Sequence, residues 1–94
     1  MNSGSDQPPR RDKVRLARRV VRSLADLQRR DLQRMRAAID LLAENPWPPN
    51  CVALQGETGV HRVRVGDYRI VYEVFDRVLE VQVVRIGHRR EVYR

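Results

Sequence analysis

The chain has 94 residues, enough for one domain with a single modest core. Its 19 Lys and Arg residues outnumber its 12 Asp and Glu residues, which gives a formal net charge of +7. Only Lys13 is a lysine, so guanidinium groups carry nearly all of the positive charge, and these stay ionised and bind phosphate through a planar fork. We therefore expect a polyanionic partner: a nucleic acid, an anionic membrane surface or an acidic protein.

Several classes of protein are not expected from this composition. No run of about 18 apolar residues is present, and the N-terminal residues lack the apolar stretch of a signal peptide. Cys51 is the only cysteine and there are 2 histidines, so neither an internal disulfide nor a zinc site is expected. We accordingly expect a cytoplasmic protein that does not enter a membrane and uses no metal or cofactor.

The first half of the chain predicts a tail, a short strand and two helices. Residues 1–12 are polar and rich in Gly, Ser and Pro, which is typical of a disordered tail, and residues 13–16 are predicted as a strand. Apolar residues then recur three or four positions apart, which predicts a helical hairpin joined at residues 28–30 and ending before Asn45. These apolar residues are Val20 or Val21, Leu24, Leu27, Leu32, Met35, Ile39 and Leu42.

The second half of the chain changes to the alternating pattern of strands. Strands are predicted at residues 60–65, 68–75 and 78–86. Gly66 and Asp67 separate the first two strands and favour a type II′ turn, whereas Asp76 and Arg77 separate the second from the third. Two short connections predict an antiparallel meander with the helical hairpin on one face. The predicted fold is α+β, in the order β-α-α-β-β-β, as one domain over residues 13–94.

The register of the first two long strands follows if Gly66 and Asp67 form a two-residue turn. Arg64 then lies directly opposite Arg69, and the faces alternate along each strand. One face collects the predicted core residues Val63, Val65, Tyr68, Ile70, Tyr72, Val81 and Val83. The other face collects the basic residues Arg62, Arg64 and Arg69.

Direct opposition of two arginines is unfavourable, by on the order of 1–3 kcal/mol before salt screening. Glu73 and Glu80 are predicted on the same face and offer one form of compensation. A bound anion offers another, and a solvated arginine-rich face without a ligand is a third interpretation. We favour the anion site, because the register brings three guanidinium groups close together.

The C-terminal residues combine several chemically active groups just beyond the last predicted strand. They are Gly87-His88-Arg89-Arg90-Glu91-Val92-Tyr93-Arg94. An aromatic ring among arginines is typical of proteins that stack on an unpaired RNA base, although a solvated basic tail fits the same pattern.

Three segments of the chain resemble a known family. They are Leu54-Gln55-Gly56, the stretch from His61 to Val74 and the stretch from Val84 to Tyr93. They resemble RelE-type toxins of bacterial toxin–antitoxin systems, within the RelE/ParE superfamily, and the likeness extends over residues 13–94. The resemblance implies a RelE-like fold, similar to that of microbial ribonucleases. It also implies a ribosome-dependent endoribonuclease that cuts messenger RNA in the ribosomal A site, contacts ribosomal RNA and is silenced by a cognate antitoxin.

The resemblance also implies a set of site residues. They are Arg62, Arg64, Arg69, His88, Arg89 and Tyr93. Well-studied members of the family carry lysines on the first meander strand, and one of these is assigned as the general base. Arginine is a poor base at neutral pH because its pKa exceeds 12. His88, Glu91 or electrostatic stabilisation without a base are the remaining alternatives.

A mechanism that fits these residues uses the 2′-hydroxyl of RNA as the nucleophile. The three strand arginines would hold the phosphate, His88 or Arg89 would supply a proton, and Tyr93 would stack on a base. Two other functions stay open: a ParE-like toxin that inhibits DNA gyrase without cutting RNA, and a non-catalytic module that binds RNA or an antitoxin. His61 has the parity of the core face and is expected to be packed there, not catalytic.

Overall fold

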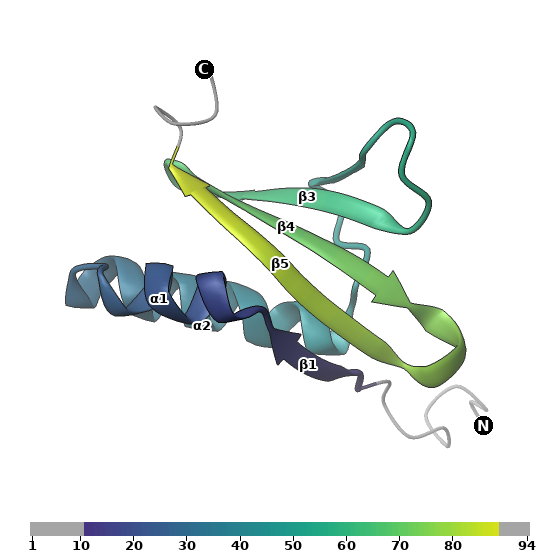
Figure 1. The fold of residues 1–94 in the computed structure, drawn as a ribbon, viewed down its shortest axis with the longest axis horizontal. Coiled ribbons are helices and arrows are strands. Elements are labelled where there is room, and N and C mark those ends of the chain that lie inside the picture. Colours follow the sequence, from purple (N-terminus) through teal and green to yellow (C-terminus); the bar gives the residue numbers. More distant parts are fainter. Residues whose placement is uncertain (1–10, 89–94) are drawn as a thin grey trace, which may run out of the picture.

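The chain folds into a mixed five-stranded sheet with both helices on one of its faces (Figure 1). The computed structural model describes residues 11–88. Its elements are β1 (Lys13–Leu16), α1 (Arg18–Ala25), α2 (Arg29–Glu44), β2 (Cys51–Ala53), β3 (Val60–Val65), β4 (Tyr68–Phe75), a 3-10 turn (Asp76–Val78) and β5 (Glu80–His88). The predicted α+β order is confirmed, with one short additional strand, β2. Neither α1 nor α2 has the length and apolar character needed to cross a membrane.

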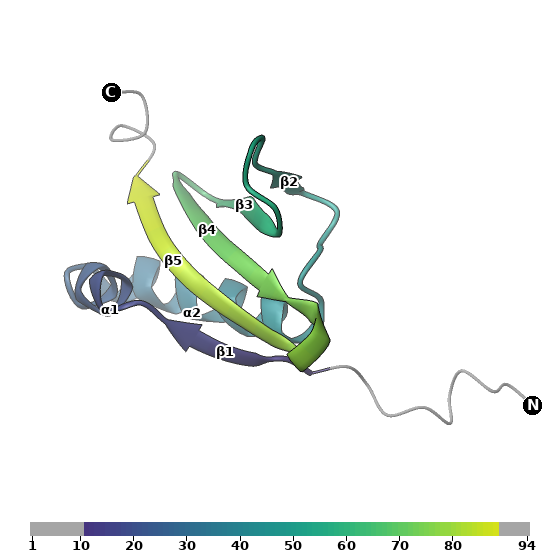
Figure 2. The same ribbon diagram turned by 45° about the vertical axis from the view of Figure 1, so that its right-hand side comes forward.

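The strands are ordered β1-β5-β4-β3-β2, so the first strand of the chain lies beside the last. β1 pairs with β5 in parallel, whereas every other neighbouring pair is antiparallel. Figure 2 shows β1 and β2 at opposite edges of the sheet. The backbone N–H of Asp12 donates to the carbonyl of Ala43 at 2.7 Å, so the folded part of the chain includes this residue from the end of the predicted tail.

The core lies between the two helices and the face of the sheet that they cover. Its buried members are Val20, Leu24, Met35, Ile39, Leu42, Val63, Ile70, Tyr72, Val81 and Val83. The helix residues recur at three- or four-residue spacing and the strand residues alternate, as each type of element requires to bury one face. Val65 and Tyr68 pack against this cluster at its margin. The predicted core face is therefore confirmed.

Two of the predicted connections are wrong in detail. Arg29 and Arg30 belong to α2, which begins at Arg29 after the extended residue Gln28, because arginine is a good helix former. The β4–β5 connection is a 3-10 turn followed by Leu79 with φ 51°, not the two residues Asp76 and Arg77. As a result, β5 begins at Glu80 and extends to His88, beyond the predicted end of the strand.

A bulge in β5 changes which residues of its second half face the core. Tyr72 lies opposite Val83, but Val71 lies opposite Arg85, so Val84 is an extra residue without a partner of its own. Strict alternation from the buried Val81 and Val83 would turn Arg85 toward the helices. The bulge instead places Arg85 on the same face as Val71, away from the core.

Candidate functional site

The β3–β4 hairpin brings together the three arginines that the sequence predicts on one face. Val65 lies opposite Tyr68, Arg64 opposite Arg69 and Arg62 opposite Val71. Of the two turn residues, only Gly66 has a positive φ, of 59°, as a type II′ turn requires at its first central position. The predicted register is therefore confirmed at every position of the hairpin.

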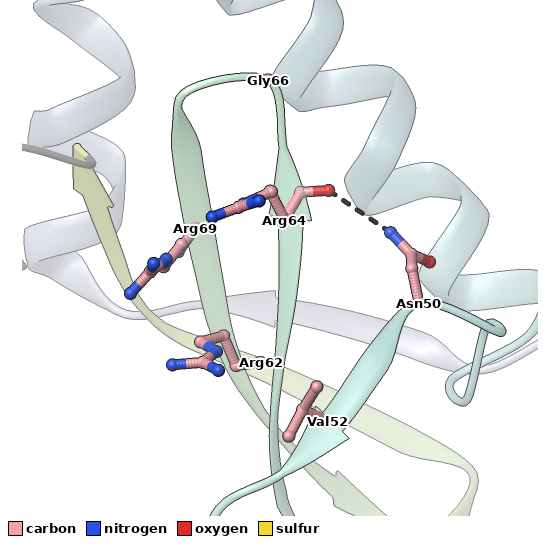
Figure 3. A pocket seen from close by; sticks show the side chains of 6 residues that line it. All are labelled: Asn50, Val52, Arg62, Arg64, Gly66 and Arg69. Atoms are coloured by element: carbon pink, nitrogen blue, oxygen red, sulfur yellow. Dashed lines mark hydrogen bonds between the residues drawn. The ribbon is translucent and has the colours of Figure 1, made fainter.

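The arginines line a depression of about 620 Å³ on the face of the sheet opposite the helices. We call this depression the arginine pocket; its lining residues are Asn50, Val52, Arg62, Arg64, Gly66 and Arg69. Figure 3 shows the three arginine side chains extending in the same direction, away from β2 and toward β5. Several guanidinium groups around one open hollow provide many N–H donors for a single anion.

The short strand β2 supplies the other side of the arginine pocket. Val52 lies directly opposite Arg62 in the sheet. The side-chain amide of Asn50, just before β2, donates to the carbonyl oxygen of Arg64 at 3.4 Å (Figure 3). Asn50 and Val52 were not predicted as site residues, because three strand residues between a proline-rich segment and a loop give too short an alternating pattern to detect.

Neither of the two carboxylates proposed to compensate the arginines lines the arginine pocket. Glu80 accepts from Nε of Arg15 at 2.7 Å, at the β1 edge of the sheet. Glu73 lies opposite Val60 and Gln82, toward the far end of the hairpin. Within residues 11–88, neither Arg62 nor Arg64 forms an ion pair. The charges of Arg62 and Arg64 are thus not neutralised by a carboxylate within these residues.

A further guanidinium approaches the hairpin from α2. A side-chain methyl group at Gly66 would lie 2.7 Å from Nη2 of Arg34, so the turn needs glycine both for its backbone angle and for the space that Arg34 occupies. Arg34 therefore adds positive charge at the tip of the hairpin, beside the arginine pocket.

His88 lies on the opposite face of the sheet from the arginine pocket. It is paired with Tyr68, and the two rings meet edge to face with centroids 5.0 Å apart. The phenol of Tyr68 donates to Asp31 of α2 at 3.2 Å. His88 also lines a separate hollow of about 280 Å³ with residues of α1 and of the segment that follows it. The structure thus brings Arg62, Arg64 and Arg69 together but not His88.

The other sequence predictions for the site have different outcomes. Arg89, Glu91 and Tyr93 lie outside the described residues. His61 stacks on the buried Tyr72 with ring centroids 5.8 Å apart, as expected for a packed histidine. No group of three His, Cys, Asp or Glu side chains within residues 11–88 is arranged to hold a metal ion.

Solved structures with the same arrangement identify the class of fold. The RelE–RelB complex from Pyrococcus horikoshii OT3 matches with a TM-score of 0.76 and 25% identity, over 83% of this chain and 94% of that one. The RelBE2 toxin–antitoxin complex from Mycobacterium tuberculosis matches with a TM-score of 0.74 and 27% identity, over 84% and 92%. The isolated E. coli RelE toxin, at 23% identity and a TM-score of 0.72, shares the fold. The chain has a RelE-like fold.

Comparison of sequences places the chain within a family. Residues 10–93 match the family described as "ParE toxin of type II toxin-antitoxin system, parDE". The protein named "Putative toxin RelE1" from Methanocaldococcus jannaschii is 31% identical, over 86% of this chain and 93% of that protein. The chain therefore belongs to the RelE/ParE superfamily of type II toxin–antitoxin toxins.

Proposed function

We propose that this toxin is an endoribonuclease that cuts messenger RNA in the ribosomal A site and is held inactive by a cognate antitoxin. The observation that carries the proposal is the arginine pocket, where Arg62, Arg64 and Arg69 surround one hollow on the outer face of the sheet. Such a cluster suits a phosphate diester, because guanidinium groups bind its oxygens through paired hydrogen bonds. The similar RelE–RelB and RelBE2 structures are toxin–antitoxin complexes, which supports a protein antitoxin as partner.

The proposed reaction uses the nucleophile that RNA itself carries. The 2′-oxygen attacks the adjacent phosphorus and loses its proton, while the bond from phosphorus to the 5′-oxygen breaks and that oxygen gains a proton. The products are a 2′,3′-cyclic phosphate and a 5′-hydroxyl. Arg62, Arg64 and Arg69 neutralise the charge that develops on the phosphate oxygens, which is usually the largest contribution to phosphoryl transfer.

In this scheme, C-terminal residues donate and accept the protons. His88 is the less suitable of the two proposed proton donors, because its ring packs on Tyr68 at the other face of the sheet. We therefore propose that Arg89 donates the proton. Tyr93 keeps its proposed role of stacking on an RNA base. Glu91 is proposed as the group that accepts the 2′-proton, since neither Arg62 nor Arg64 can act as a base at neutral pH.

Inhibition of DNA gyrase is the second candidate function. The family that residues 10–93 match is described as the ParE toxin, and this observation favours it. Inhibition of gyrase does not require the three guanidinium groups of the arginine pocket to act on RNA. A supercoiling assay with purified gyrase tests it directly.

Primer extension on messenger RNA from cells that express the toxin separates these functions. We expect position-specific breaks with the intact chain and none with Arg69→Ala.

Replacement of the 2′-hydroxyl at the cut site by hydrogen should also abolish cleavage, and continued cleavage would exclude the proposed chemistry. Intact messenger RNA together with inhibited gyrase would establish the alternative. RNA that is bound to the toxin but never cut would instead indicate a non-catalytic binding module.

A further inference from the structure

The bulge in β5 places a further arginine, Arg85, on the outer face of the sheet, opposite the helices. Arg62 lies opposite Val71, and Val71 lies opposite Arg85, so the two arginines flank one valine in a row across three strands. Two strand spacings separate their backbones by about 10 Å. Arg85 is exposed and forms no ion pair within residues 11–88.

Within residues 11–88, small and apolar residues separate Arg85 from the arginine pocket on this face of the sheet. Arg69 lies opposite Gly87, which contributes no side chain to this face, and Val71 lies between Arg62 and Arg85. The arginines of the pocket extend toward β5 in Figure 3. A chain of phosphates that enters the arginine pocket can therefore continue across β4 toward Arg85.

Arg85 also lines a second hollow on this face, of about 350 Å³. Its apolar members are Leu54, Val60, Val71 and Val84, and its charged members are Arg19, Glu57, Glu73 and Arg85. An apolar lining suits the face of a nucleobase, whereas carboxylates repel phosphate but accept hydrogen bonds from the exocyclic amino groups of bases. The cations and the carboxylates thus suit different parts of one nucleotide.

We propose that this second hollow binds the nucleotide next to the cut site. Arg85 binds the flanking phosphate, the apolar residues contact the base, and Glu73 accepts a hydrogen bond from its amino group. The inference rests on the proposed ribonuclease function and adds a specificity determinant to it: adenine, cytosine or guanine is preferred over uracil at this position. An acidic peptide fits less well, because Glu57 and Glu73 would lie against it.

Steady-state cleavage of messenger RNA on programmed ribosomes tests the role of Arg85. Arg85→Ala should raise KM about tenfold or more and leave kcat within about twofold, as expected for loss of a charged hydrogen bond that binds substrate and transition state equally. Arg85→Lys should recover most of the affinity. Arg77→Ala is the matched control, because it removes the same charge from the exposed turn between β4 and β5.

A neutral methylphosphonate in place of the flanking phosphate makes the test specific to one contact. This substitution should raise KM for the unsubstituted protein and have no further effect on Arg85→Ala, since the two changes remove the same interaction. Glu73→Ala should reduce the discrimination against uracil. Thermal unfolding midpoints near that of the unsubstituted protein show that the variants are folded.

The outcomes separate the inference from the function on which it rests. If the unsubstituted toxin cuts RNA and Arg62→Ala does not, but Arg85→Ala behaves like Arg77→Ala, the flanking subsite is wrong and the proposed function stands. If Arg85→Ala weakens antitoxin binding alone, the surface is a protein contact and the inference is overturned. Absence of cleavage by the unsubstituted toxin rejects the proposed function itself.

Discussion

At the scale of single residues, the direct opposition of Arg64 and Arg69 sets stability against the proposed function. Two like charges face each other across β3 and β4. Replacing Arg64 by Gln should raise the free energy of unfolding by about 0.2–1 kcal/mol at low salt, because it removes the repulsion. If the proposed function holds, the same change should lower cleavage by at least about tenfold, because the proposed phosphate site loses one guanidinium.

Urea unfolding of Arg64→Gln at two ionic strengths checks the origin of this effect. The gain in stability should shrink as salt is added, because the charges are exposed enough to be screened. A gain in stability that is independent of salt would mean that repulsion between Arg64 and Arg69 does not destabilise the folded protein. Arg36→Gln, which changes an exposed arginine on α2, is the matched control for net charge.

Tyr72 is a fully buried core residue whose side chain carries a polar group. Its hydroxyl donates to the carbonyl of Pro46 at 2.7 Å. Burial raises the pKa of Tyr72 well above its usual value, and a hydrogen bond with the Cys51 thiol raises the pKa further. Tyr72→Phe should cost about 1–2 kcal/mol at neutral pH, since it leaves the buried Pro46 carbonyl without its donor.

The raised pKa of Tyr72 also predicts a pH dependence. Above about pH 10 the unfolded chain releases the phenolic proton while the folded protein retains it, so stability falls as the pH rises, by up to about 1.4 kcal/mol per unit. Tyr72→Phe should lack this part of the decline. Denaturation of both proteins between neutral pH and pH 11 measures the difference, and parallel curves would contradict the assignment.

At the scale of elements, α2 begins without a side-chain cap. Gln28 precedes the helix with φ −66° and ψ 154°, the geometry of a capping residue, but its side chain accepts no hydrogen bond from the first turn. Gln28→Asp should stabilise the protein by about 0.5–1.5 kcal/mol, because aspartate caps the free N–H groups and complements the helix dipole. Differential scanning calorimetry should show a higher Tm, whereas Gln33→Asp within the helix should lower it.

The elements that the sequence predicted correctly are those whose pattern is local and repeated. The β3–β4 hairpin combines a clear alternation with a glycine at the required turn position, and this pattern is sufficient to align Arg62, Arg64 and Arg69. β2 was not predicted, because its three residues form a strand only by pairing with β3. The position of Arg85 opposite Val71 was not predicted, because a pattern of alternating residues does not reveal a bulge.

At the scale of the whole molecule, the net charge of +7 predicts a strong dependence on salt. The logarithm of kcat/KM for RNA cleavage should fall linearly with the logarithm of the salt concentration, with a slope of about −0.7 for each phosphate bound. A pocket phosphate and a flanking phosphate together give about −1.4. Arg85→Ala should reduce the slope by one such increment, and Arg77→Ala should leave it unchanged.

The pairing of β1 with β5 has a consequence for the time at which the toxin becomes active. Lys13 lies opposite Glu80 in this parallel pair, so β1 has no strand to pair with until β5 has been synthesised. At roughly 5–20 residues per second, several seconds separate the synthesis of these two strands. The five-stranded sheet therefore cannot be completed until β5 has been synthesised, and this delay follows from the order of the strands.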